Sequence, residues 1–247
     1  MARSVGRSLP GDPTGRGARW LAAVMGLAAV AAWVAAFFLA TAPSVGKPAA
    51  LQAAYFAGNS ARLLACLVLF EVGAALLIGF FVGLWYLLRA ADPSVGPLAA
   101  VGAAGGVATQ TLVIVGMGVS QLAVVTAARG GAPETVKTIE QGSWIMFAAS
   151  AVPTVVFAAA LGLAMLKSGV PGRWAGWLGL AVAALHVPAA LTLAQEGAFA
   201  LDGPFANLAP LAFMAWVVAA CVLLLKGAGA RTGSAGRVPE DAVRPTA

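Results

Sequence analysis

The chain alternates between long apolar segments and short polar ones, and the apolar segments are long enough to cross a membrane. The clearest runs from Arg62 to Arg89, where 26 residues between two arginines contain a single charged side chain, Glu71. About 20 helical residues, each rising about 1.5 Å, span a hydrocarbon core of about 30 Å. This segment is therefore predicted to be a transmembrane helix with an arginine near each interface.

Five further apolar segments predict an all-α fold, a polytopic transmembrane bundle of six helices. The predicted helices cover about residues 20–40, 62–89, 98–127, 141–166, 174–193 and 207–225. Polar connections are expected between them, including a loop over residues 41–61 and another that ends at Glu140. Because the connections are short, each helix should pack beside its neighbours in sequence, as in an antiparallel bundle.

Polar segments at both ends of the chain set the domain boundaries and the orientation. Residues 1–19 form a predicted disordered basic arm, 20–226 the transmembrane domain, and 227–247 a predicted disordered tail. If the N-terminus is cytoplasmic, 11 of the 15 lysines and arginines fall on the cytoplasmic side and 4 on the outer side. The positive-inside rule therefore predicts that both termini are cytoplasmic.

Composition supports this class and argues against nucleic-acid binding. Hydrophobic residues make up 61% of the chain and charged residues only 10%, and the mean hydropathy is +0.90. A soluble domain typically has about 25% charged residues. The net charge of +6 comes from basic residues at the ends of apolar segments, not from one basic face.

Four polar side chains inside the predicted helices fall at similar depths and form a candidate intramembrane cluster. Counting residues from the helix ends places Glu71, Gln110, Ser150 and His186 roughly 10 to 14 Å below the outer face. An acid within the hydrocarbon core is energetically costly, so Glu71 is expected to face protein or water rather than lipid.

Two interpretations of this cluster stay open. Glu71 could carry a proton with His186 as its partner, a base that titrates near neutral pH. Alternatively, Glu71 is a protonated or paired acid that stabilises the bundle, and His186 makes an interhelical hydrogen bond beside Pro188. Gln110 and Ser150 are most simply hydrogen-bonding groups between helices.

Small residues at helical spacing predict close helix contacts. Ala75, Gly79 and Gly83 lie on one i, i+4 ridge of the second predicted helix, and Gly102 and Gly106 repeat at the same spacing in the third. Such rows let the backbone of another helix approach closely.

The sequence contains no recognisable catalytic or metal-binding pattern. A single histidine cannot form a bis-histidine haem site, and no cluster of His, Cys and carboxylates has metal-ligand spacing. Motifs for a serine hydrolase or a phosphate-binding loop are absent from the sequence. Cys66 and Cys221 are expected near opposite membrane faces, which argues against a disulfide. We therefore expect no catalytic residue, no metal, no cofactor and no enzymatic activity.

The turn from Lys167 to Gly179, with the sequence KSGVPGRWAGWLG, carries a family resemblance. It resembles the S-G-x-x-P-R-W-x-G-W-L-G turn of uncharacterised bacterial multi-pass membrane proteins with about six helices and no known function. Here Pro171-Gly172-Arg173 stands where that pattern has Pro-Arg. The resemblance implies a six-helix fold and a bacterial source, and it assigns no functional residue.

Two functional hypotheses follow. The first is a non-enzymatic accessory, sensory or structural protein of a bacterial plasma membrane. Its expected partners are the lipid bilayer and either another membrane protein or further copies of this chain. The alternative is a small proton-linked carrier or permease that uses Glu71 and His186.

Overall fold

A computed structural model describes residues 13–40, 43, 45–192, 197–200 and 203–229, and most of the two predicted disordered ends lies outside these ranges. The described residues form seven α-helices and one short 3-10 turn. They are α1 (Pro13–Leu39), α2 (Ala49–Gly58), α3 (Ser60–Ala91), η1 (Pro93–Val95), α4 (Gly96–Ala128), α5 (Pro133–Ser168), α6 (Arg173–Ala189) and α7 (Pro204–Gly229).

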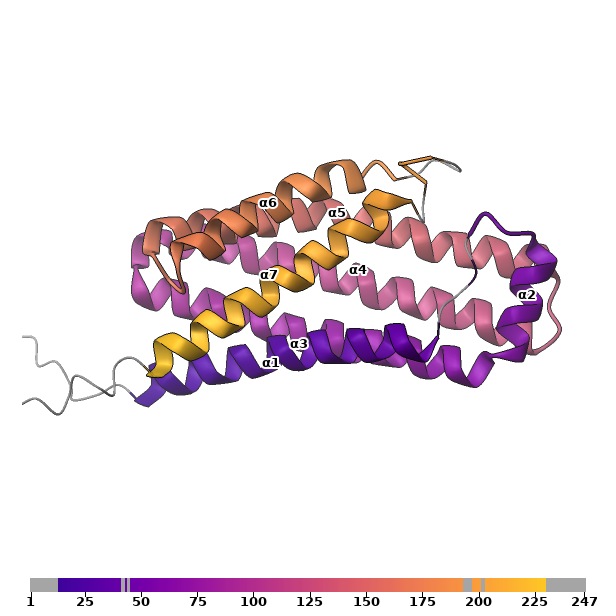
Figure 1. Ribbon diagram of the computed structural model, residues 1–247, viewed down its shortest axis with the longest axis horizontal. Coiled ribbons are helices and arrows are strands. Elements are labelled where there is room, and N and C mark those ends of the chain that lie inside the picture. Colours follow the sequence, from indigo (N-terminus) through magenta and orange to yellow (C-terminus); the bar gives the residue numbers. More distant parts are fainter. Residues whose placement is uncertain (1–12, 41–42, 44, 193–196, 201–202, 230–247) are drawn as a thin grey trace, which may run out of the picture.

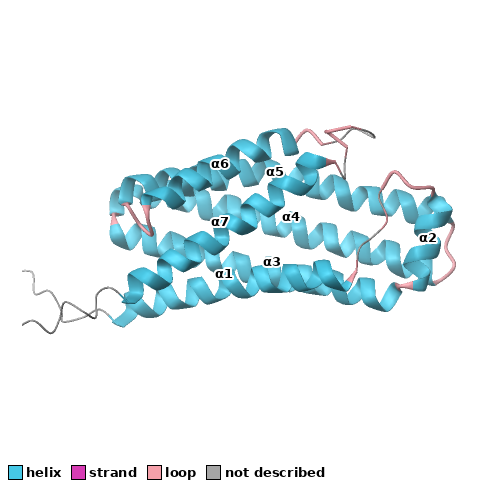
Figure 2. Cartoon of the chain, viewed as in Figure 1, coloured by secondary structure: helices cyan, strands magenta, loops and turns pink. Residues whose placement is uncertain are grey.

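The prediction of an all-α, polytopic fold is confirmed. Five helices, α1, α3, α4, α5 and α7, are long and apolar enough to cross a membrane. The other long segment that was predicted to span, α6, is 17 residues long and ends at Ala189, before the predicted end at residue 193. Figure 2 shows that helix makes up nearly all of the described chain.

Two segments that were predicted as loops contain helix. Helix α2 lies within the predicted loop 41–61, and it buries Gln52, Ala53 and Phe56. Helix α5 begins at Pro133, eight residues before the predicted start at residue 141. Proline in the first turn and an acidic residue beside it, Glu134, both favour a helix start there. Charged residues hid this start, because a helix that extends beyond the hydrocarbon core need not be apolar there.

The long helices run alternately up and down one axis and enclose the core. Helix α1 begins and α7 ends at one end of the bundle, the terminal end, and α2 lies at the opposite end, the α2 end (Figure 1). Packing joins α1 to α3, α3 to α4, α4 to α5, α5 to α6, α6 to α7, and α7 back to α1. Helix α2 packs on α4 and α5. The predicted packing of sequence neighbours is therefore present.

Aromatic side chains fill the middle of this ring of helices. The rings of Phe81 and Phe157 have centroids 4.9 Å apart, and Trp216 lies 6.1 Å from Phe157. All three side chains are at most 1% exposed. The indole Nε1 of Trp216 donates to the carbonyl of Ala175 at 3.0 Å, which ties α7 to α6. This cluster closes the bundle between its two ends.

Most of the small residues singled out in the sequence lie at helix contacts. Gly79 and Gly83 face side chains of α1, Gly102 faces α5, and Gly106 faces α3. Ala75, on the same ridge as Gly79, is exposed on the surface of the bundle.

The closest backbone approach joins α5 to α6. A Cβ atom on Gly162 would lie 2.8 Å from the carbonyl oxygen of Gly176, and a Cβ on Gly176 would lie 2.7 Å from the carbonyl oxygen of Gly162. These distances are shorter than a carbon and an oxygen tolerate, so the two helices can pack this way only with glycine at both positions.

Replacing Gly162 with leucine is expected to lower the free energy of unfolding by about 1–3 kcal/mol, because the new side chain overpacks the α5–α6 contact. Gly118→Leu is the matched control, since Gly118 also lies within a helix but is exposed, with no atom within 4 Å of its Cβ position. Thermal unfolding in mild detergent measures both. Equal losses in the two variants would contradict the close contact.

Candidate functional site

A cavity of about 580 Å³ lies inside the bundle, toward the α2 end. Its walls come from the last third of α1, the first third of α3, the middle of α4, the first two thirds of α5, the end of α6 and the start of α7. Its volume falls within the range of about 300–1,000 Å³ that is usual for small-molecule sites.

The wall is mainly aromatic, with a smaller set of polar side chains. The aromatic lining residues are Trp33, Phe37, Phe70, Trp144, Phe147, Phe157 and Phe213. The polar ones are Thr109, Gln110, Ser120, Glu140, Ser143, Ser150, Thr154, His186, Thr192 and Asn207. Among the described lining residues there is no lysine or arginine, and Glu140 is the one carboxyl group.

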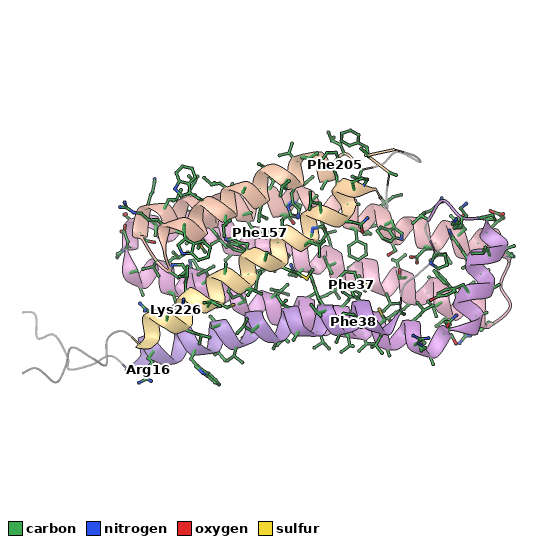
Figure 3. The ribbon with its side chains drawn as sticks, in the orientation of Figure 1. Arg16, Phe37, Phe38, Phe157, Phe205 and Lys226 are labelled. Atoms are coloured by element: carbon green, nitrogen blue, oxygen red, sulfur yellow. The ribbon has the colours of Figure 1, made fainter. Side chains whose placement is uncertain are left out.

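The cavity reaches the surface of the bundle between α1 and α7. Helix α7 crosses the bundle obliquely and lies against α1 near the terminal end (Figure 1). Trp33 and Phe213 still make contact, with ring centroids 6.1 Å apart. Farther toward the α2 end, Phe37 of α1 is 50% exposed and Leu211 of α7 is 55% exposed, and both line the cavity. Figure 3 shows Phe37 on the α2 side of Phe157. Phe37 and Leu211 therefore border the opening, together with the exposed Asn207 of α7.

Glu140 is held in the wall by hydrogen bonds from two helices. Nε1 of Trp144 donates to Oε1 at 3.1 Å, and Oγ of Ser120, on α4, donates to Oε2 at 2.7 Å. Oγ of Ser143 lies 2.9 Å from Oγ of Ser120. Both oxygens of the Glu140 side chain thus accept hydrogen bonds.

Gln110, on α4, is the unpaired polar group of this wall. Its side chain is 0% exposed, and neither its amide oxygen nor its amide nitrogen has a hydrogen-bond partner among the described residues. An unpaired buried polar group costs about 1–3 kcal/mol. Gln110 thus places in the cavity wall an amide that no described residue satisfies.

Hydroxyl groups join α4 to α5 below Glu140. Oγ1 of Thr109 and Oγ1 of Thr154 are 3.2 Å apart. Thr154 also bonds the carbonyl of Ser150 at 2.7 Å, and the Ser150 hydroxyl donates to the carbonyl of Phe147 at 2.7 Å. The Ser150 side chain is thus satisfied within its own helix, whereas Thr109 and Thr154 connect two helices.

Of the four cluster residues predicted from sequence, three line the cavity and one does not. Gln110, Ser150 and His186 are lining residues. Glu71 lies outside the lining and is partly buried between α3 and α4, where Nε2 of Gln121 donates to its Oε1 at 2.9 Å. Glu71 and His186 therefore do not share the cavity, and depth along the membrane normal alone could not reveal this.

His186 presents one ring nitrogen to its own helix. Its Nδ1 lies 2.8 Å from the carbonyl oxygen of Val182. Since that oxygen can only accept, Nδ1 carries a proton, and in the neutral ring Nε2 is an acceptor.

Glu140 was not predicted as a site residue, because the polar residues around it resemble a loop. Its helical neighbours carried a usable signal: Ser143, Trp144 and Phe147 follow it at spacings of three, four and seven, which places all four on one face of a helix. All four line the cavity.

The chain has no match among protein-family models, curated proteins or solved structures. The resemblance of the turn 167–179 therefore stays a prediction. Fold and composition define the class, a polytopic α-helical membrane protein with a cavity inside its bundle.

Among the residues that the structure describes, no group of three or more His, Cys, Asp or Glu could hold a metal ion. Cys66 and Cys221 are free and buried, as expected.

Gln110→Met is expected to raise the free energy of unfolding by about 1–2 kcal/mol, because it removes unpaired buried polar atoms at nearly constant volume. Gln121→Met, on the same helix, is the matched control and should lower it, because Glu71 loses its amide donor. Chemical unfolding in mild detergent measures both variants. A loss of stability in Gln110→Met would show that this amide is paired in the folded protein.

Proposed function

We propose that this chain is a non-enzymatic membrane protein that binds a small, largely apolar molecule inside its helix bundle and acts as a sensory or accessory component. The observation that carries the proposal is the cavity of about 580 Å³ inside the bundle, with its mainly aromatic lining.

The lining has the composition of a ligand site. Small-molecule sites are mostly apolar and aromatic, with a few polar groups that fix the orientation of the ligand. Here seven aromatic side chains form much of the wall, and Gln110, Glu140 and His186 supply the strongest hydrogen-bonding groups. The apolar border formed by Phe37 and Leu211 favours a ligand that arrives through the lipid.

The close packing of the terminal half supports ligand binding rather than passage of a solute through the bundle. Phe157 and Phe213 line the cavity on the side of the terminal end. Beyond them Phe80, Phe81 and Trp216 are at most 1% exposed. A solute in the cavity would have to displace this aromatic cluster to cross the bundle.

Helix α7 supplies a route from binding to a response. Its first part lines the cavity, and its last part lies beside the start of α1, where a Cβ atom on Gly227 would be 2.9 Å from Nη1 of Arg19. A ligand that fills the space between α1 and α7 would change the angle between these helices, and the change would reach the terminal end.

We further propose that the protein resides in a bacterial plasma membrane with both termini cytoplasmic. Six of the ten described lysines and arginines lie in or next to the terminal end: Arg16, Arg19, Arg89, Lys167, Arg173 and Lys226. Figure 3 shows Arg16 and Lys226 there. With all the basic residues of the two chain ends added, the positive-inside rule favours a cytoplasmic terminal end. The cavity would then open toward the outer leaflet.

Filling the cavity is expected to abolish binding of a neutral apolar probe. Neopentylbenzene should raise the melting temperature of the wild-type protein, since a ligand that binds the folded state stabilises it. Ala148→Phe should remove this shift, because Ala148 lines the cavity. The matched control is Ala149→Phe, since the adjacent Ala149 is exposed and lies outside the lining. Thermal shifts at constant detergent concentration measure all three proteins. Equal shifts in the two variants would contradict the binding proposal.

The orientation can be tested with single cysteines at two exposed lysines. In protoplasts, a membrane-impermeant maleimide should label Lys47→Cys, at the α2 end, and should label Lys167→Cys, in the last turn of α5, only after permeabilisation. The native Cys66 and Cys221 are buried and should give little background. The reverse labelling pattern would show that the terminal end faces outward.

A further inference from the structure

We infer that the ligand is an organic cation, an ammonium compound with an apolar body, whose charge pairs with Glu140 while its body packs against the aromatic wall. This inference rests on the proposed function, and it names the chemical class of molecule that the same cavity takes.

Glu140 has no lysine or arginine beside it among the described residues of the cavity wall. The side chain is 7% exposed, and both of its oxygens accept hydrogen bonds. Lys137, one turn earlier on α5, instead donates from Nζ to the carbonyl of Lys47 at 3.1 Å. Arg62 donates from Nη2 to the carbonyl of Leu39 at 2.7 Å. Neither cation lines the cavity. Burying a carboxylate is costly unless it is paired, so a cationic ligand would supply the charge that the wall lacks.

His186, the remaining base of the wall, is too far away to pair with Glu140. Helices α5 and α6 are in register where Gly162 meets Gly176. Glu140 lies 22 residues from Gly162, and His186 lies ten residues from Gly176. At about 1.5 Å per residue, the two side chains are separated by about 18 Å along the bundle axis. Direct contact across that distance is impossible, so His186 leaves the charge of Glu140 unbalanced.

Aromatic side chains lie in the cavity wall beside Glu140. Trp144 donates to Glu140 from its indole N–H, and the ring of Phe147 has its centroid 6.1 Å from that of Trp144. Aromatic faces attract alkylammonium groups within about 6 Å of the ring centroid, and more strongly away from water. A carboxyl group with aromatic rings beside it in the same wall therefore favours an ammonium over a neutral group of the same shape.

The depth of Glu140 in the membrane also matches the position of the charge in an amphipathic cation. Glu140 lies 27 residues from Lys167 along α5, which corresponds to about 40 Å, whereas the hydrocarbon core is about 30 Å thick. Phe157 lies about 15 Å from Lys167 by the same rise. With Lys167 near the inner interface, Glu140 would be at the level of the outer headgroups and Phe157 near the middle of the membrane. An amphipathic cation in the outer leaflet has the same arrangement of charge and apolar body.

Two probes of the same shape test the charge. Benzyltrimethylammonium and neopentylbenzene differ by a charged nitrogen in place of a carbon. Wild-type protein in nonionic detergent is titrated with each probe, and free concentrations are measured by equilibrium dialysis. The cation is expected to bind at least about tenfold more tightly than the hydrocarbon. Glu140→Gln should reduce the affinity for the cation to that for the hydrocarbon and leave the hydrocarbon unaffected. Glu71→Gln, which alters the acid outside the cavity, should change neither affinity.

The possible outcomes separate this inference from the proposed function. Equal or weaker binding of the cation by the wild-type protein overturns the inference and leaves the binding proposal standing. Absence of binding by either probe overturns both. If Glu140→Gln does not fold, Glu140→Asp takes its place, because it keeps the charge and should retain the preference. The comparison of the two probes on wild-type protein is decisive without any variant.

Discussion

Close packing of small residues at the terminal half of the bundle is the constraint on which the rest of this structure depends. Backbone meets backbone where Gly162 faces Gly176, and Gly79 and Gly83 admit side chains of α1. Within lipid, helices gain little from hydrophobic burial, so contact through small residues holds them together. Toward the α2 end, aromatic and hydroxyl side chains occupy the facing positions, the helices separate, and the cavity forms there.

Prolines introduce irregular backbone into three of the helices that line the cavity. Pro153, Pro188 and Pro210 lie inside helices that line the cavity. Proline has no N–H, so each leaves the carbonyl four residues earlier without its helical hydrogen bond. For Pro210 that residue is Ala206, and both line the cavity. Irregular backbone is tolerated at membrane depth where it is buried in protein or borders a cavity, so this proline fits the wall of an internal site.

The apolar segments alone predicted the helical membrane fold, because a continuous run of Leu, Ala and Val has few other stable environments. Residue counting also identified Gln110, Ser150 and His186 as polar groups at a common depth, and all three line the cavity. The same arithmetic could not separate Glu71 from them, because the rotation of α3 directs that acid toward Gln121 of α4. Glu140, in contrast, lines the cavity but was assigned to a loop. The first two turns of α5 are polar and resemble a loop. The signals for a helix there are Pro133, Glu134 and the spacing from Glu140 to Ser143 and Phe147.

The contrast between Glu71 and Glu140 bears on how such a protein would respond to a ligand. Glu71 joins two neighbouring helices through the amide of Gln121 and lies outside the cavity lining. Glu140 lies in a cavity that opens between α1 and α7, so a bound cation could exchange with the outer leaflet while the terminal half stays packed. Helix α7 borders that opening and also lies beside the start of α1. A response that leaves α3, α4 and α5 in place could therefore travel along α7.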